Sequence, residues 1–377
     1  MGRLGIVLVA LLAGVAMGGG TGTPAPDAAK GVGPYFDFFE AFARPDPWRS
    51  PRSRGKLARY LECARLGGGL AFCPENIYWT RTLHPQPRPD PHRAAIEFAR
   101  ILGSADLDVY LGINLLADER DGSFYTPVPP HVPRPHDFGN PLLRAAYAQE
   151  TLDIVNLAQA SSGGRVAYVS LVLEADFYYY CPSTRPDYPN LIEALLEAHA
   201  GITAEHPALP VGVYFTLNAL WDEYQRDPSV YAAIVGDPRL NGLAGTGPGL
   251  DFLGASSYPI GIPPLFSDPD EVVREYYALA VTATVKPFHV PELGWPSENV
   301  EVRGQIVESS PAEQAEFVRQ YFERLIAGLP IAPTVWFVPH DFSMDGFPEV
   351  FCFFRDMGLW DRHLLHAKPA WGVWLNH

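Results

Sequence analysis

The chain has 377 residues, a formal net charge of −15, 47% hydrophobic residues and 12% aromatic residues. A chain of this length can build one large core or two ordinary domains. The acidic excess disfavours nucleic acid and anionic membranes as partners, because both attract clustered lysine and arginine. An acidic, aromatic-rich composition instead suits an uncharged ligand such as a sugar.

The first residues have the pattern of a secretory signal peptide. Arg3 precedes an apolar stretch that ends at Met17, and Ala16 and Gly18 supply the small residues of a cleavage site. The stretch is short for a membrane span, and an uncleaved anchor is the alternative. We expect a signal peptide over residues 1–18, a flexible leader over residues 19–31, and a secreted or periplasmic protein without further membrane contact.

The four cysteines leave two possibilities open. Cys63 and Cys73 are close enough in sequence to form a disulfide in an exported protein, and buried free thiols are the alternative. Cys181 and Cys352 have no such neighbour. No Cys-x-x-Cys or His-rich spacing predicts a structural metal.

Short apolar runs recur along the rest of the chain and alternate with helical patterns. Near-continuous apolar runs are typical of parallel strands covered on both faces. With a first strand near residues 33–37 there are eight, the others covering residues 70–73, 107–114, 166–174, 209–216, 250–258, 285–292 and 332–338. Together with helices such as residues 142–155, 191–199 and 312–326, they predict one α/β domain over residues 32–377, a single (β/α)8 TIM barrel.

Two details support this choice of fold. Ser310, Pro311 and Glu313 form the start signal of the last predicted helix, with an N-cap, a proline at the first position and a capping box. An open doubly wound sheet would place a Gly-rich phosphate turn after an early strand, whereas Gly67–Gly69 precedes one.

Active sites of TIM barrels lie at the carboxyl ends of the strands, and two of the runs end in a glutamate. These are Glu174 and Glu292. Burying a carboxylate costs several kcal/mol unless pairing or chemistry holds it there, so two such positions predict one shared site. Asn114 and Tyr258 close other runs, and Trp336 lies near the end of the last.

The segment Pro291–Ser297 (Pro-Glu-Leu-Gly-Trp-Pro-Ser) resembles the strand-seven nucleophile motif of the clan A glycoside hydrolases, close to its form in β-1,3-glucanases and endo-galactanases. Tyr168–Asp176 is similar to their strand-four segment with the acid/base. Asp251–Pro259 is similar to the strand-six segment whose tyrosine bonds the nucleophile, and Trp336 lies where strand eight offers a stacking aromatic.

The resemblance implies a retaining glycosidase that needs no metal or organic cofactor. Glu292 would be the nucleophile and Glu174 the acid/base, with carboxyl groups roughly 5 to 5.5 Å apart. A carbohydrate substrate is the expected partner, while the sugar, the linkage and the oligomeric state are not predicted. The expected substrate-binding residues are Asn114, Tyr258, Trp295 and Trp336.

Structural alternatives stay open for these residues. Glu174 is also compatible with a buried ion pair, Asp176 with a cap, and aromatic residues at strand ends with a capped core. Leu173 stands where the clan usually has an asparagine that binds the sugar 2-hydroxyl. This departure favours the alternative function, a weak or inactive carbohydrate-binding barrel at the cell surface.

Overall fold

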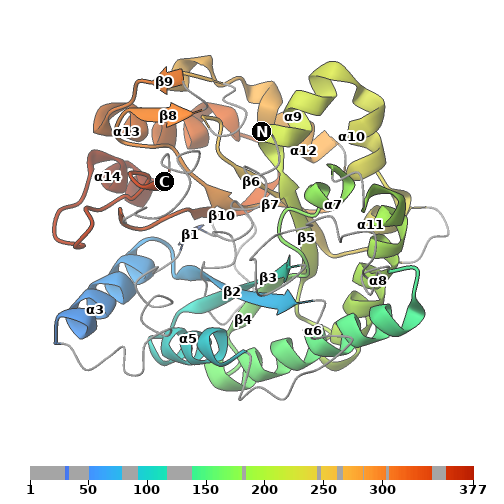
Figure 1. Cartoon of the computed structure of the whole chain (residues 1–377). Coiled ribbons are helices and arrows are strands. Elements are labelled where there is room, and N and C mark those ends of the chain that lie inside the picture. The colour runs from blue at the N-terminus through green and yellow to red at the C-terminus, as the bar shows by residue number, and fades with distance from the viewer. Residues whose placement is uncertain are drawn as a thin grey trace, which may run out of the picture.

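Eight parallel strands close into a barrel with helices around it (Figure 1). The structure is a computed structural model that describes residues 30–33, 51–78, 92–116, 138–180, 184–243, 248–260, 266–282, 284–302, 305–341 and 354–377. The strand order around the barrel is β1-β10-β7-β6-β5-β4-β3-β2, and the prediction of a TIM barrel is confirmed.

The strands follow the predicted series. The barrel consists of β1 (Lys30–Val32), β2 (Leu70–Tyr78), β3 (Asp108–Leu116), β4 (Val166–Ser170), β5 (Val211–Thr216), β6 (Phe252–Ser257), β7 (Phe288–Leu293) and β10 (Ile331–Trp336). A small antiparallel pair, β8 (Val300–Val302) and β9 (Gln305–Val307), follows β7.

Helices occupy the connections between the strands. They are α3 (Pro51–Leu66), α5 (Arg93–Ser104), α6 (Pro141–Ser162), α7 (Asp176–Tyr180), α8 (Tyr188–Glu205), α9 (Leu217–Arg226), α10 (Pro228–Ile234), α11 (Pro238–Asn241), α12 (Arg274–Thr282), α13 (Pro311–Gln320) and α14 (Pro369–Asn376). Short 3₁₀ turns cover Arg185–Asp187 and Pro269–Glu271, and a π-helical turn, Tyr321–Leu325, continues α13. Ser310 is the N-cap of α13 as predicted, because its Oγ accepts a hydrogen bond from Glu313 N–H at 3.2 Å. The Glu313 carboxylate accepts a hydrogen bond from Ser310 Oγ at 2.7 Å.

The first strand begins earlier than predicted. β1 covers Lys30–Val32, so it begins before the predicted start at residue 33 and includes the last two residues of the expected flexible leader. Residues 34–37 of the predicted strand lie outside the described residues. Gly31 explains the error, because a Cβ atom there would lie 2.3 Å from the backbone oxygen of Leu70. The small residue therefore allows β1 and β2 to approach closely, which a sequence pattern does not distinguish from a leader. The predicted signal peptide and the rest of the predicted leader lie outside the described residues.

The fourth strand ends earlier than predicted, at Ser170 instead of Glu174. Leu171 N–H donates to Gly212 on β5, whereas Leu173 N–H donates to Ile113 on β3. In a regular parallel strand, residues two apart bond to the same neighbour, so this switch marks an irregularity. Glu174 consequently lies on a turn beyond the strand.

Aromatic rings fill the barrel. Phe252 and His289 stack with ring centroids 3.8 Å apart, and the rings of Tyr168 and Tyr110 lie 4.9 and 5.9 Å from His289. Burial keeps the pKa of His289 well below its usual value, so this imidazole is neutral. The barrel interior is a packed core, which leaves the strand ends as the place for chemistry.

Candidate active site

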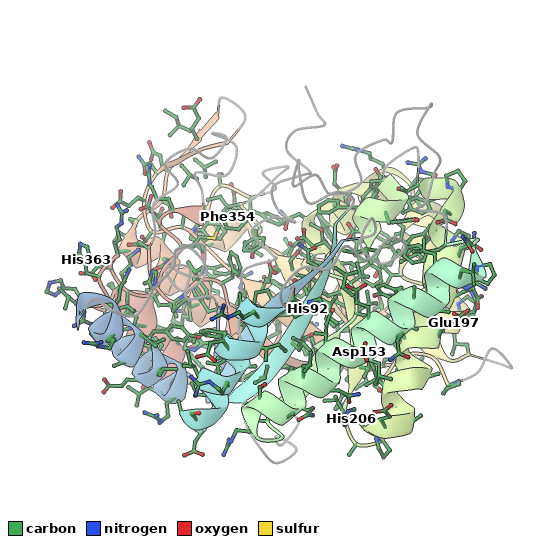
Figure 2. All side chains as sticks on the ribbon, turned by 60° about the horizontal axis from the view of Figure 1, so that its bottom comes forward. His92, Asp153, Glu197, His206, Phe354 and His363 are labelled. Atoms are coloured by element: carbon green, nitrogen blue, oxygen red, sulfur yellow. The ribbon has the colours of Figure 1, made fainter. Side chains whose placement is uncertain are left out.

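The carboxyl ends of the barrel strands lie together at one end of the molecule. Figure 2 shows Phe354 at this end, and His206, which precedes β5, toward the other. Because the strands are parallel, Glu174 just beyond β4 and Glu292 near the end of β7 share the Phe354 end. The structure therefore brings the two predicted glutamates to the same end of one barrel.

Glu292 is held by two tyrosines. Its side chain is buried, and its Oε1 and Oε2 atoms accept hydrogen bonds from Tyr214 and Tyr258, each at 2.6 Å. Burial raises the pKa of Glu292 to about 7, and the two donors oppose this rise because they stabilise the anion. The pair of phenols fixes the carboxylate and favours its charged form.

Glu174 has different surroundings. It is completely buried, and its Oε1 accepts a hydrogen bond from Ser256 Oγ at 2.7 Å. Ser256 on β6 pairs with Glu292 on β7 in the strand register. The serine that donates to Glu174 is therefore the neighbour of Glu292 on the next strand. Burial, and then the charge of Glu292, raise the pKa of Glu174 well above its usual value. Of the two carboxyl groups, Glu174 therefore has the surroundings that favour the protonated form more strongly.

The backbone of Glu174 is strained. Its φ of +52° is left-handed, a conformation that costs a non-glycine residue roughly 1–2 kcal/mol. Hydrogen bonds on both sides hold the turn, since Leu173 N–H donates to Ile113 at 3.0 Å and Ala175 N–H donates to Tyr214, also at 3.0 Å. Strain that neighbouring bonds maintain is typical of functional positions.

A second layer of polar contacts orients Tyr258. Asn218 bonds to both the backbone N–H and the carbonyl of Tyr258, and its Oδ1 also accepts a hydrogen bond from Tyr276 at 2.8 Å. All of these groups are buried. The amide thereby fixes the strand end from which the phenol of Tyr258 reaches Glu292.

The two predicted tryptophans lie elsewhere. Trp295 and Trp336 are completely buried. Their ring centroids lie 4.9 and 6.3 Å from that of Phe317 on α13, and Trp336 also packs against Trp374 on α14. Both rings belong to the layer between barrel and helices, and the structure does not bring them to the carboxyl pair.

Phe337, the residue after Trp336, packs beside Tyr258 instead. Its ring packs against Tyr258 and Phe354 with centroid distances of 5.7 and 5.5 Å. Adjacent residues of an extended chain point to opposite faces, so a shift of one residue separates Phe337 from Trp336. A run of two neighbouring aromatics did not show which one faces the site.

Asn114 and Leu173 lie near the third strand. Asn114 is buried near the end of β3, two residues after Gly112 and hence on the same face. A Cβ atom on Gly112 would meet the Phe72 ring at 2.3 Å and the Leu173 side chain at 3.0 Å. Leu173 therefore packs into the barrel against β2 and β3.

Other sequence features have plain outcomes. Within the described part of the chain, Cys63 and Cys73 are buried free thiols, while Cys181 and Cys352 lie outside it. The described residues contain no group of three His, Cys, Asp or Glu side chains arranged to hold a metal ion. The described helices include none that is both long and apolar enough to cross a membrane.

The chain matches no protein-family model and no curated protein sequence, but solved structures resemble it. GH5_18 from Bifidobacterium longum subsp. longum, crystallised with Manβ1-4GlcNAc, matches with a TM-score of 0.62 and 15% identity over 93% of this chain and 77% of that one. GH5_18 from Streptomyces cattleya, in complex with GlcNAc, gives a TM-score of 0.59 and 14% identity over 93% and 79%. Fungal β-1,4-galactanases give 0.51 and 19% over 76% and 82%.

At these identities the likeness is one of fold. The predicted resemblance to clan A glycoside hydrolases is confirmed at this level, since the chain shares the TIM-barrel architecture of GH5 enzymes and galactanases.

Proposed function

We propose that this protein is a retaining glycoside hydrolase that cleaves β-linked poly- or oligosaccharides. The observation that carries the proposal is the unequal setting of two buried glutamates at one end of the barrel. Glu292 receives two phenol donors, and Glu174 receives one hydroxyl donor and the repulsion of a neighbouring charge. Surroundings that separate the pKa values of two carboxyl groups define an acid and a nucleophile.

The reaction follows from these settings. An oxygen of ionised Glu292 attacks the anomeric carbon while the leaving oxygen takes the proton of Glu174, and an ester between sugar and Glu292 forms. Ionised Glu174 then takes a proton from water, whose oxygen attacks the anomeric carbon and releases Glu292. Both carboxyl groups return to their starting states, so the cycle needs no further reactant.

The comparisons support a carbohydrate as the substrate. Two of the similar structures hold Manβ1-4GlcNAc or GlcNAc, and a third group consists of β-1,4-galactanases. Mannosides and galactosides are therefore the first substrates to test. Export is part of the proposal as well, and the basic, apolar and small-residue pattern of residues 1–18 supports it.

The test is a panel of β-glucans, galactans, mannans and aryl β-glycosides, assayed with the wild-type protein and with Glu292→Gln. We expect hydrolysis by the wild type and a loss of about 10⁴-fold or more in the variant, because the amide cannot act as the nucleophile. Mass spectrometry after reaction with a 2-fluoro glycoside should find the sugar on Glu292. Wild-type turnover by a folded Glu292→Gln variant would contradict the assignment.

A carbohydrate-binding barrel without turnover is the second candidate, and Leu173 favours it. The side chain at this position lies against Gly112 and carries no hydrogen-bonding group for a sugar. Calorimetric binding of an oligosaccharide, with equal affinity in the wild type and in Glu292→Gln and with no product from either, would support this candidate.

A further inference from the structure

A third buried carboxyl group, Asp176, lies beside the acid/base. It follows Glu174 by two residues, begins α7 and is completely buried. Its Oδ1 accepts a hydrogen bond from Thr216 N–H on β5 at 2.8 Å, and its Oδ2 has no hydrogen-bond partner among the described residues. A helix cap requires only a hydrogen-bond acceptor, so a fully buried carboxyl group calls for another explanation.

The bond from Thr216 secures the turn that carries Glu174. Ala175 N–H donates to the carbonyl of Tyr214, and Asp176 accepts from Thr216, so two successive residues of the turn attach to β5. The side chain of Tyr214 in turn donates to Glu292. Both carboxyl groups of the pair are thus positioned from the same strand, one through the turn and one through the phenol.

The electrostatic setting of Asp176 is negative or neutral. The titratable groups that interact with it are Glu174 on the same turn, Tyr180 on α7 and Tyr188 on α8. Within the described residues Asp176 forms no ion pair with a basic side chain. Burial raises the pKa of Asp176 to about 7, and its charge adds to the rise in the pKa of Glu174.

We propose that Asp176 is a positioning residue of the acid/base: it fixes the left-handed turn through Thr216, and its charge keeps the proton on Glu174. The catalytic consequence rests on the proposed function, whereas the coupling between the two carboxyl groups does not. The coupling is therefore the quantity to measure first.

Asp176→Asn keeps the shape and an acceptor for Thr216 N–H but removes the charge. Infrared difference spectra over a pH titration detect the protonated carboxyl group, and Glu174→Gln assigns its signal. We expect the Glu174 proton to be lost at a pH about one unit lower in Asp176→Asn than in the wild type. The basic limb of kcat/KM should move down by the same amount.

Asp251→Asn is the matched control. Asp251 also accepts a hydrogen bond from a backbone N–H of β5, that of Val211 at 3.0 Å, but at the opposite end of the strand. Its substitution should leave the titration of Glu174 unchanged even if it lowers stability. An equal shift in both variants would overturn the proposal.

An unchanged Glu174 titration in folded Asp176→Asn would also overturn it. If that variant does not fold, the titration of Glu174 in Glu292→Gln decides, because this variant removes the coupling to Glu292, and a second step then comes from Asp176. A single step for Glu174 would then reject the coupling. Failure of the proposed function looks different, since the panel would show no hydrolysis while the infrared shift persisted.

Discussion

Glu292 and Glu174 are both glutamates in one buried site, but the residues that surround them differ. Glu292 lies within strand β7, and two phenols hold both of its oxygens. Glu174 lies on a left-handed turn beyond an irregular strand and receives one serine donor. The number of hydrogen-bond donors separates the two groups more than burial does, because burial is nearly complete for both.

This difference shows how one barrel can hold two buried carboxyl groups in settings that favour different protonation states. Hydrogen bonds to an anion lower its pKa, whereas burial next to a like charge raises it. The β5–β6 side supplies the phenols for Glu292, while the β4 turn brings Glu174 beside Asp176. Substitutions around either glutamate should reduce this difference between the two carboxyl groups.

Removing the acid should have the largest effect among the following changes. Glu174→Gln cannot donate a proton, so we expect kcat on substrates with poor leaving groups to fall roughly 10²- to 10⁴-fold. Aryl glycosides with acidic phenols as leaving groups need little protonation and should lose far less. Steady-state kinetics over a series of phenols measures this difference as a steeper dependence on leaving-group pKa.

Glu75→Gln is a control for this experiment. Glu75 is also a buried glutamate on a barrel strand, but it faces His92, with 3.4 Å between His92 Nδ1 and Glu75 Oε1. Its substitution should leave the leaving-group dependence as in the wild type. A Glu174→Gln variant with the same dependence as the wild type would remove the acid role from Glu174.

Removing a phenol from Glu292 should have an intermediate effect. In Tyr214→Phe or Tyr258→Phe the carboxylate loses one charge-assisted hydrogen bond, so the pKa of Glu292 rises above about 7. Because the nucleophile must be ionised, the acidic limb of kcat/KM should move to higher pH by about one unit, and the rate below the limb should fall about tenfold.

Tyr276→Phe separates this effect from a general loss of packing. The Tyr276 hydroxyl donates to Asn218 rather than to a carboxyl group of the pair. We expect this variant to keep the acidic limb at the wild-type pH. A limb that moves equally in all three variants would show that the tyrosines act through the packing of the barrel and not through the charge of Glu292.

The sequence predicted the barrel well because the physical signal was strong. Buried parallel strands require continuous apolar runs, and these runs lie close to the observed strands from β2 onward. The start of β1 was predicted too late because Gly31, a small residue that allows close strand packing, resembles a residue of a flexible leader. The end of β4 was predicted too late because a local switch of hydrogen-bond partners is not visible in the amino-acid composition.

The site was only partly predictable. Glu174, Glu292 and Tyr258 came from strand ends and a motif, and the structure brings them together. Tyr214 and Ser256 lie within β5 and β6, where an inward tyrosine or serine resembles any other core residue until the strand register is known. Trp336 and Phe337 are neighbouring aromatic residues whose side chains point to opposite faces, and the sequence alone did not show which of them faces the site.

The smallest effect on the rate is expected from Leu173→Asn, which restores the residue usual in clan A. Leu173 packs against Gly112 and Phe72 inside the barrel, so an amide there would lose apolar contacts and be left without a partner. We expect the free energy of unfolding, from urea denaturation, to fall by about 2–3 kcal/mol, with kcat/KM per folded molecule unchanged. Leu173→Met, which keeps volume and polarity, should cost less than about 1.5 kcal/mol. A clear rise in kcat/KM on β-glycosides in folded Leu173→Asn would instead show that the side chain reaches the sugar, and that the missing asparagine limits this protein.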